Sequence, residues 1–226
     1  MFNGFSKDGI ELLKDISKNN TKEYFMTQEE RYKKEILEPN RAYVEEMGEY
    51  LQILIPNLHA EPKVNRSLFK IYRDSRFHLS EPIKEKVGII IWQGAGHRMQ
   101  SSSFYMHYGV DSYFVSAGIR WFKPPLLKAY RDYLQKEEHR ESLHNILEEL
   151  QQKGYLLPEK RYKRYPRGCN SEDSFSYLYL YDAIFAFKEF NLDKVFFTKK
   201  ILDNNFKIYQ ELFALEQWVY ELTLSL

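Results

Sequence analysis

Two neighbouring segments that together predict a hairpin, residues 103–108 and 112–119, constrain the fold of this chain more than any other feature. Residues 103–108 predict a strand with Ser103, Tyr105 and His107 on one face. The opposite face carries Phe104, Met106 and Tyr108. Residues 112–119 predict a second strand, and the turn 109–111 is short enough to join the two as a hairpin. Strands with such short connections indicate an antiparallel sheet.

Segments with helical periodicity precede and follow this hairpin. Residues 7–19 predict an amphipathic helix with Ser6 as its N-cap, and Thr21 caps a second helix that we expect Pro39 to end. Residues 40–54 carry a third apolar stripe. Further helices are expected from Pro124, over residues 143–150, from Ser171 or Ser174, and from Thr198 onward.

Three other segments predict strands. Residues 68–72 alternate, with Phe69 and Ile71 on one face, residues 87–92 form a continuous apolar run, and residues 195–197 predict a short strand. The pattern as a whole indicates an α+β fold, in which a central antiparallel sheet is flanked by N-terminal and C-terminal helices. We expect a single globular domain spanning residues 1–226, because 43% of the residues are hydrophobic and supply a large core.

Composition restricts the classes of partner. The 33 basic and 32 acidic residues give a net charge of +1, so the protein is not a polycation built to coat DNA or an anionic membrane. The single cysteine, Cys169, forms no internal disulfide, which fits a reducing compartment. We find neither a signal peptide nor a run of about 20 apolar residues. We therefore expect a cytoplasmic protein that does not enter a membrane.

A cluster of charges follows the predicted strand 68–72. Arg73, Asp74 and Arg76 lie within four residues of one another. A carboxylate beside an arginine holds the guanidinium group in one orientation, which leaves a second arginine for an anionic ligand. The alternative is an ion-pair network that fastens a loop to the body of the domain.

A second basic cluster lies in residues 154–170, where Pro158, Pro166 and Gly168 predict a loop. Its cations are Lys160, Arg161, Lys163, Arg164 and Arg167, interleaved with Tyr155, Tyr162 and Tyr165. Because the protein as a whole is almost neutral, we expect these two clusters to account for any attraction of anions.

Four segments carry a resemblance to a known family. Residues 69–77 are Phe-Lys-Ile-Tyr-Arg-Asp-Ser-Arg-Phe and residues 19–25 are Asn-Asn-Thr-Lys-Glu-Tyr-Phe. Residues 104–107 are Phe-Tyr-Met-His and residues 163–168 are Lys-Arg-Tyr-Pro-Arg-Gly. In this order they resemble the domain of unknown function 2461 family, whose members are mostly bacterial and uncharacterised. The chain departs from the family pattern in residues 78–84, which keep a proline and a final lysine and lack the tyrosine between them.

The resemblance and the charges lead to one hypothesis of function. We expect Arg73 and Arg76, oriented by Asp74, to meet Lys163, Arg164 and Arg167 with His107 nearby, forming a pocket for phosphate, a carboxylate or a nucleotide. In the alternative, each cluster is paired separately with acidic neighbours such as Glu81 or Glu172.

Two further classes of function stay open. The basic, tyrosine-rich loop 155–167 is suited to stacking on bases of a nucleic acid, although the near-zero net charge disfavours such a partner. A non-catalytic interaction protein is the third possibility. We expect no metal site and no cofactor, because the histidines lack metal-binding spacing and no glycine-rich nucleotide motif is found. No catalytic residue and no oligomeric state follow from the sequence.

Overall fold

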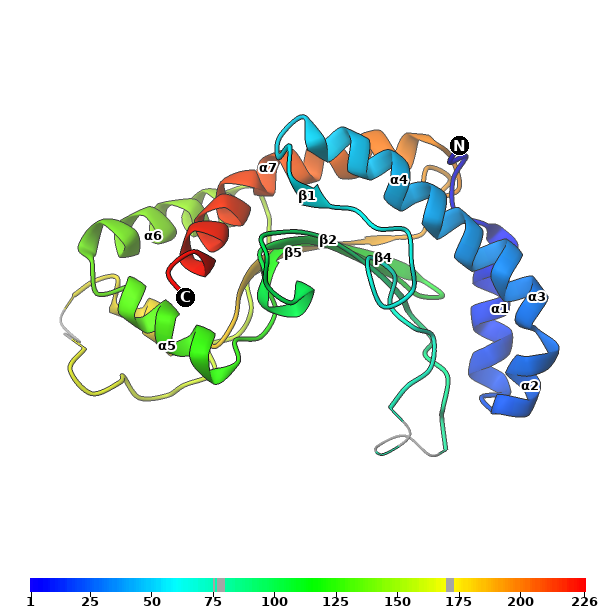
Figure 1. The fold of residues 1–226 in the computed structure, drawn as a ribbon, viewed down its shortest axis with the longest axis horizontal. Helices are drawn as coiled ribbons and strands as arrows, with labels where there is room; N and C mark the ends of the chain where they lie inside the picture. The colour runs from blue at the N-terminus through cyan, green and yellow to red at the C-terminus, as the bar shows by residue number, and fades with distance from the viewer. Residues whose placement is uncertain (75, 77–79, 170–172) are drawn as a thin grey trace. The chain divides into compact units, whose positions relative to one another are not determined.

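The α+β prediction is confirmed. The computed structural model describes residues 1–74, 76, 80–169 and 173–226, and these residues form a five-stranded antiparallel sheet whose strands neighbour one another in sequence order (Figure 1). Helices precede and follow these strands in the chain. The strands are β1 (Leu58–His59), β2 (Val87–Gln93), β3 (Ser103–Tyr108), β4 (Ser112–Ile119) and β5 (Ile184–Asn191).

Backbone contacts divide the chain into two compact units. The first unit comprises Met1–Ile91, Tyr105–Val115 and Glu189–Lys207, and the second comprises Trp92–Phe104, Ser116–Lys188 and Ile208–Leu226. Strands β2 to β5 and the last helix, α7 (Lys200–Thr223), each contribute residues to both units. The single domain expected from the sequence stays a prediction.

The predicted hairpin is confirmed and supplies part of the core of the first unit. The Gly109 amide donates to the Ser112 carbonyl at 2.9 Å and closes the turn between β3 and β4. Met106 and Tyr108 are buried, as their alternation predicted. The Tyr108 hydroxyl donates to the Asn40 side chain at 3.0 Å, so this buried polar atom is hydrogen-bonded.

The N-terminal helices of the first unit begin at the predicted caps. Helix α1 (Lys7–Lys18) follows Ser6, whose Oγ accepts from the Gly9 amide at 3.2 Å. Helix α2 (Lys22–Thr27) follows Thr21, whose Oγ1 accepts from the Tyr24 amide at 3.1 Å. The chain then continues through α3 (Glu29–Tyr32), the π-helical turn η1 (Lys33–Leu37) and α4 (Glu38–Gln52), and α1 and α3 lie side by side (Figure 1).

The prediction that Pro39 ends a helix is wrong. Pro39 lies in the first turn of α4, directly after the π-helical turn, in which the Glu38 amide donates to the Lys33 carbonyl. Proline lacks an amide hydrogen and its ring clashes with the carbonyl four residues earlier, here that of Glu35. The wider π-turn accommodates both defects, so the helical path continues.

The predicted strand 68–72 is also wrong as a continuous strand. Leu68 forms an isolated antiparallel bridge with Ile89 of β2, and Tyr72 forms a separate bridge with Ile83. The chain leaves the edge of β2 after the Phe69 amide donates to the Gly88 carbonyl at 3.1 Å. The following segment then pairs with residues 82–84 instead of with the sheet.

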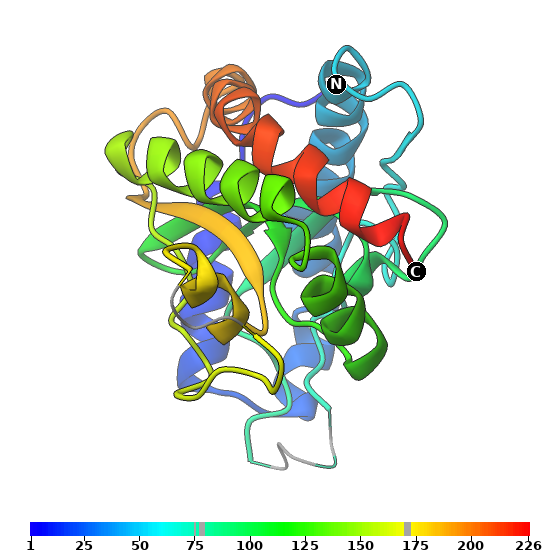
Figure 2. The same ribbon diagram turned by 90° about the vertical axis from the view of Figure 1, so that its left-hand side faces the viewer.

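The second unit contains α5 (Pro124–Tyr133), α6 (Glu137–Gln152), the 3-10 turn η3 (Ser176–Leu180) and the C-terminal part of α7. Helix α5 begins at Pro124 as predicted, whereas α6 extends beyond the predicted residues 143–150 at both ends. The C-terminal part of α7 lies beside α6 (Figure 2), where the Trp218 indole donates to the His139 carbonyl at 3.3 Å. Trp218 also packs edge-on against Tyr133 at 5.3 Å between ring centroids.

Two predictions for the C-terminal third are wrong. The helix expected from Ser174 is the short turn η3 followed by strand β5, whose buried Ile184 and Ala186 alternate with partly exposed neighbours. The other expected start, Ser171, lies outside the described residues. The strand expected at residues 195–197 is a turn, because the Asp193 carboxylate accepts from the amides of Val195 and Phe196 at 2.9 and 3.1 Å.

A buried carboxyl group lies in the core of the second unit. Glu216 of α7 is 1% exposed, and one of its carboxyl oxygens accepts from the side-chain amides of Gln93 and Gln217 at 3.1 and 2.8 Å. Its other carboxyl oxygen, Oε1, has no hydrogen-bond partner among the described residues. Burial raises the pKa of Glu216 to about 7, since desolvation outweighs these hydrogen bonds.

The close approach of α1 to the π-turn predicts a strong effect of one methyl group. A Cβ at Gly9 would lie 2.6 Å from the Glu35 carbonyl oxygen. We therefore expect Gly9→Ala to lower the free energy of unfolding by about 1–3 kcal/mol, despite the better helix propensity of alanine. Urea unfolding measures this difference. Gly109→Ala is the control, because its nearest neighbour would lie at an ordinary 3.4 Å; equal effects of the two substitutions would contradict the interpretation.

The buried carboxyl group predicts a pH-dependent stability. The folded-state pKa of Glu216 is raised from 4.5 to about 7, so its favourable contribution is complete below pH 4.5 and is lost as the pH rises to about 7. This loss amounts to about 3 kcal/mol. Glu216→Gln should remove it, raising the melting temperature above that of the wild type at pH 8 and much less at pH 4.5. Glu221→Gln, an exposed site on the same helix, should leave the wild-type profile unchanged.

Candidate functional site

Arg73 joins its own segment to residues 82–83 of the same unit. Its Nε donates to the Ile83 carbonyl at 3.1 Å, and its backbone amide donates to the Pro82 carbonyl at 2.7 Å. Asn20 also holds Ile83: its Nδ2 donates to the Ile83 carbonyl and its Oδ1 accepts from the Ile83 amide, both at 2.9 Å. Ile83 is fully buried, so these bonds satisfy polar backbone atoms that water does not reach.

Asp74 orients Arg76 rather than Arg73. The Arg76 guanidinium donates to both carboxylate oxygens of Asp74, with the shortest contact at 2.6 Å. The Arg76 backbone amide also donates to this carboxylate at 3.1 Å. The Arg76 hydrogen bonds hold the pKa of Asp74 well below its usual range. Because the Arg76 side chain is 78% exposed, this pair contributes little to stability.

His107 lies in a row of aromatic rings on the sheet of the first unit. Its ring stacks on Phe114 of β4, with 4.7 Å between centroids and 17° between planes. Tyr105 follows at 5.6 Å from His107 on the same strand. All three side chains are partly exposed, whereas the neighbouring side chains on the opposite face are buried. His107 is therefore part of an aromatic surface.

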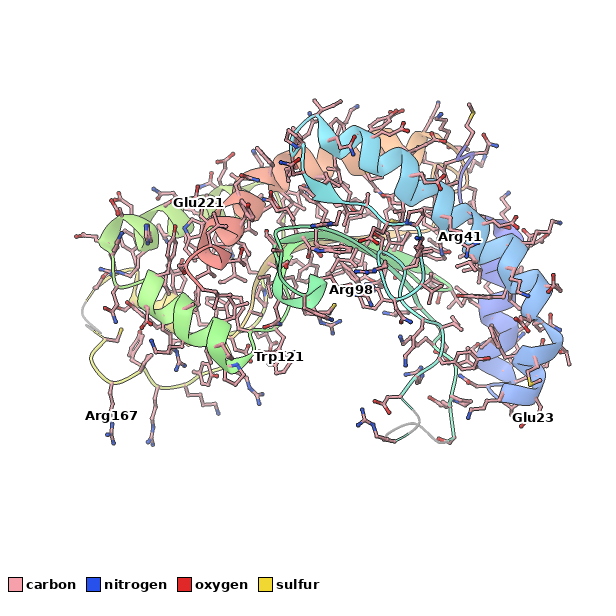
Figure 3. All side chains as sticks on the ribbon, in the orientation of Figure 1. Glu23, Arg41, Arg98, Trp121, Arg167 and Glu221 are labelled. Carbon is pink, nitrogen blue, oxygen red and sulfur yellow. The ribbon has the colours of Figure 1, made fainter. Side chains whose placement is uncertain are left out.

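The basic loop of the second unit is exposed. Lys163, Arg164 and Arg167 all have exposed side chains, and Figure 3 shows Arg167 extending from this loop. Within the described residues no carboxylate forms an ion pair with any of the three. Glu172, which the alternative interpretation invoked as a partner, lies outside that part of the chain.

A cavity of about 460 Å³ separates this loop from α5. Three cationic side chains line it, those of Lys128, Arg131 and Arg167, together with the carboxylate of Asp132. Its other walls come from Pro124, Leu127, Gln135, Pro166, Gly168, Cys169 and Tyr179. We call it the basic cavity.

The cations of the basic cavity differ in their surroundings. Lys128 pairs with Asp132 at 2.5 Å, so this carboxylate offsets one of the three charges. The guanidinium of Arg131 lies over the Tyr162 ring, 4.9 Å from its centroid, and its Nε is buried with no hydrogen-bond partner among the described residues. The ring orients the flat face of the guanidinium through a cation–π contact. Arg167 supplies the third charge from the loop.

Each unit thus brings together only some of the predicted site residues. In the first unit Arg73, Asp74 and Arg76 share one segment, and His107 lies on the sheet. In the second unit Arg167 lines the basic cavity, and neither Lys163 nor Arg164 is among its lining residues. A common pocket formed by both clusters stays a prediction.

No group of three or more histidine, cysteine, aspartate or glutamate side chains is arranged to hold a metal ion in the described parts of the chain. No helix among the described residues is both long and apolar enough to cross a membrane.

Comparison with known proteins identifies the family. The family model described as "Conserved hypothetical protein (DUF2461)" matches residues 8–218 of the 226. The chain belongs to the DUF2461 family. No curated protein matches it.

The residues that give this DUF2461 chain its basic cavity were only partly visible in the sequence. Arg167 was predicted from the density of cations in its loop. Lys128 and Arg131 were missed, although they lie three residues apart and so on one face of a helix. The apolar face of α5 was recognised, but nothing local indicates that the basic loop lies across from its polar face.

The Asn20 contacts of this DUF2461 chain predict a structural role for that residue. Asn20→Ala removes both hydrogen bonds to Ile83 and leaves the backbone amide of Ile83 buried without a partner. This should lower the free energy of unfolding by about 1–3 kcal/mol. Asn19→Ala is the matched control, because the Asn19 side chain makes only an exposed contact of 3.5 Å, and its effect should stay within about 0.5 kcal/mol. Chemical denaturation compares the two; equal stabilities would refute the role of Asn20.

Proposed function

We propose that the chain binds a small anionic ligand, such as phosphate or a carboxylate, in the basic cavity of the second unit. The observation that carries this proposal is the charge of the lining, where Lys128, Arg131 and Arg167 face one carboxylate, that of Asp132. Since Asp132 already pairs with Lys128, two arginines remain to attract an anion.

The charge and shape of the two guanidinium groups in the basic cavity favour an anionic ligand over a cation or a neutral ligand. Like charges that line one cavity repel each other, and a bound anion relieves this repulsion. A guanidinium group presents several donors in a planar fork that matches the oxygens of phosphate and carboxylate. Arg131 lies against Tyr162, so less freedom of its side chain is lost on binding.

The size of the cavity favours a small molecule. About 460 Å³ lies within the range of small-molecule sites, which is about 300–1,000 Å³. The pocket expected from the sequence, which includes Arg73, Arg76 and His107, is not part of this proposal. A cytoplasmic location, for which the single cysteine is the argument, stays a prediction. We assign no catalytic residue.

The alternative of nucleic-acid binding by loop 155–167 has less support. Tyr155 is 2% exposed, and its hydroxyl donates to Glu211 at 2.7 Å, so its ring is not accessible for stacking on a base. Lys160 lies 4.8 Å above the centroid of the Tyr177 ring. Of the three tyrosines of this loop, Tyr165 is 41% exposed and is the best placed to contact a base.

A thermal-shift titration with inorganic phosphate, sulfate and a set of small carboxylates tests the proposal. A ligand at one hundred times its dissociation constant should stabilise the wild type by about 2.7 kcal/mol. Arg131→Ala and Arg167→Ala should each abolish most of this shift, because each removes a cation from the lining.

Arg161→Ala is the matched control, since Arg161 is an exposed arginine of the same loop that does not line the cavity. It should retain the full shift. If no anion stabilises the wild type, or if all three variants lose the shift equally, the basic cavity is not the binding site.

A further inference from the structure

Four partly exposed rings form a continuous surface on the sheet of the first unit. Phe69 contacts Tyr105 edge-on at 5.9 Å between centroids, and Tyr105 lies 5.6 Å from His107. His107 stacks on Phe114, which lies 6.2 Å from Tyr105. The rings come from the segment before β2, from β3 and from β4. We call this set the aromatic face.

A glycine leaves room for the aromatic face. A Cβ at Gly88 of β2 would lie 3.0 Å from both the Phe69 ring and the Tyr105 hydroxyl oxygen. A larger residue at this position would push these two side chains away from the strand. The absence of a side chain on β2 therefore lets the rings extend over three neighbouring segments.

The opposite face of the same strands packs as an ordinary core. Tyr108 is 2% exposed and contacts the Phe5 and Phe196 rings at 5.0 and 5.4 Å. Met106 is fully buried and accepts a hydrogen bond from Asn205. The four rings of the aromatic face are more exposed than these core rings.

Polar groups border the aromatic face. The Lys84 ammonium lies 6.0 Å from the centroid of the Phe69 ring and donates to the Lys70 carbonyl at 2.8 Å. On the far side, the Ser112 hydroxyl donates to the Glu189 carboxylate at 2.6 Å. A cation therefore lies at the Phe69 end and hydrogen-bonding oxygens lie beside Phe114, on the same strand.

We propose that the aromatic face binds the base of a free nucleotide by stacking, with Lys84 as a cation for its phosphate. Tyrosine, histidine and phenylalanine on neighbouring strands of an open sheet are suited to stacking on the flat face of any base. This mode needs no glycine-rich phosphate loop, which the sequence lacks. It is independent of anion binding in the basic cavity.

The charges favour a single nucleotide over a strand of nucleic acid. A bound strand requires many phosphate contacts, and its affinity depends on a dense array of cations. The protein has a net charge of +1, and the pair formed by Asp74 and Arg76 removes one cation of the first unit from such an array. One base with one phosphate matches four rings and one nearby lysine.

Binding of adenosine and AMP, measured by equilibrium dialysis, tests the proposal. Adenosine is uncharged, so it reports on stacking without any contribution from the basic cavity. Phe114→Leu keeps an apolar side chain and removes the ring, and it should weaken both ligands by about tenfold to a hundredfold. Phe190→Leu is the matched control: Phe190 stacks on Tyr113 at 5.0 Å in the same unit and does not belong to the aromatic face. It should bind both ligands as the wild type does.

Photocrosslinking of the wild type with 8-azidoadenosine gives a second readout that does not depend on the folding of a variant. The label should be found in peptides that contain residues 103–116, which include three of the four rings. The proposal is overturned if neither adenosine nor AMP binds in the millimolar range, if Phe190→Leu weakens binding as much as Phe114→Leu, or if the label lies elsewhere. Binding of a single-stranded oligonucleotide without binding of AMP would also overturn it.

Discussion

The division of the β3–β4 hairpin into a packed face and an exposed face determines how the first unit is built. Because successive side chains of a strand point to opposite sides, Met106 and Tyr108 enter the core, while Tyr105 and His107, which alternate with them, do not. A shift of the register by one residue would bury His107 and expose Tyr108, whose hydroxyl would lose its bond to Asn40. The same alternation therefore specifies both the core and the surface on which a ligand can rest.

Polar groups inside the two units illustrate two ways of balancing burial. In the first unit the Asn205 amide donates to the Tyr43 hydroxyl at 2.8 Å, both residues are fully buried, and the Asn205 Oδ1 has no hydrogen-bond partner among the described residues. In the second unit Glu216 is buried with one oxygen unpaired among the described residues. Protonation is the response that costs least, because it removes the charge that burial penalises. The charge of the Asn205–Tyr43 pair does not change with pH near neutrality, whereas the charge of Glu216 does.

The parts of the fold that were predictable from sequence are those with local causes. The caps Ser6 and Thr21 act on amides three residues away, and the alternation of residues 103–119 lies within the hairpin itself. The failures have distant causes: residues 68–72 leave the sheet because the following chain pairs with Ile83, and Pro39 stays helical because the preceding turn widens. In the candidate site, too, features with local causes were predictable and features with distant causes were not. Arg167 stands in a dense run of cations, but its neighbours Lys128 and Arg131 belong to a helix some 36–39 residues earlier, and only the folded chain brings them to one cavity.

The π-helical turn before Pro39 gives one helical path two directions of contact. A π-turn holds one more residue than an α-turn, and each residue of an α-helix advances the side chains by about 100° around the axis. The side chains of α3 are therefore out of phase with those of α4. Helix α3 meets α1, whereas α4 directs Asn40 to Tyr108 of β3 and Tyr43 to Asn205 of α7. A straight α-helix of the same length would keep its side chains in one phase. The extra residue therefore lets the two parts of one continuous helix pack against different neighbours without a loop between them.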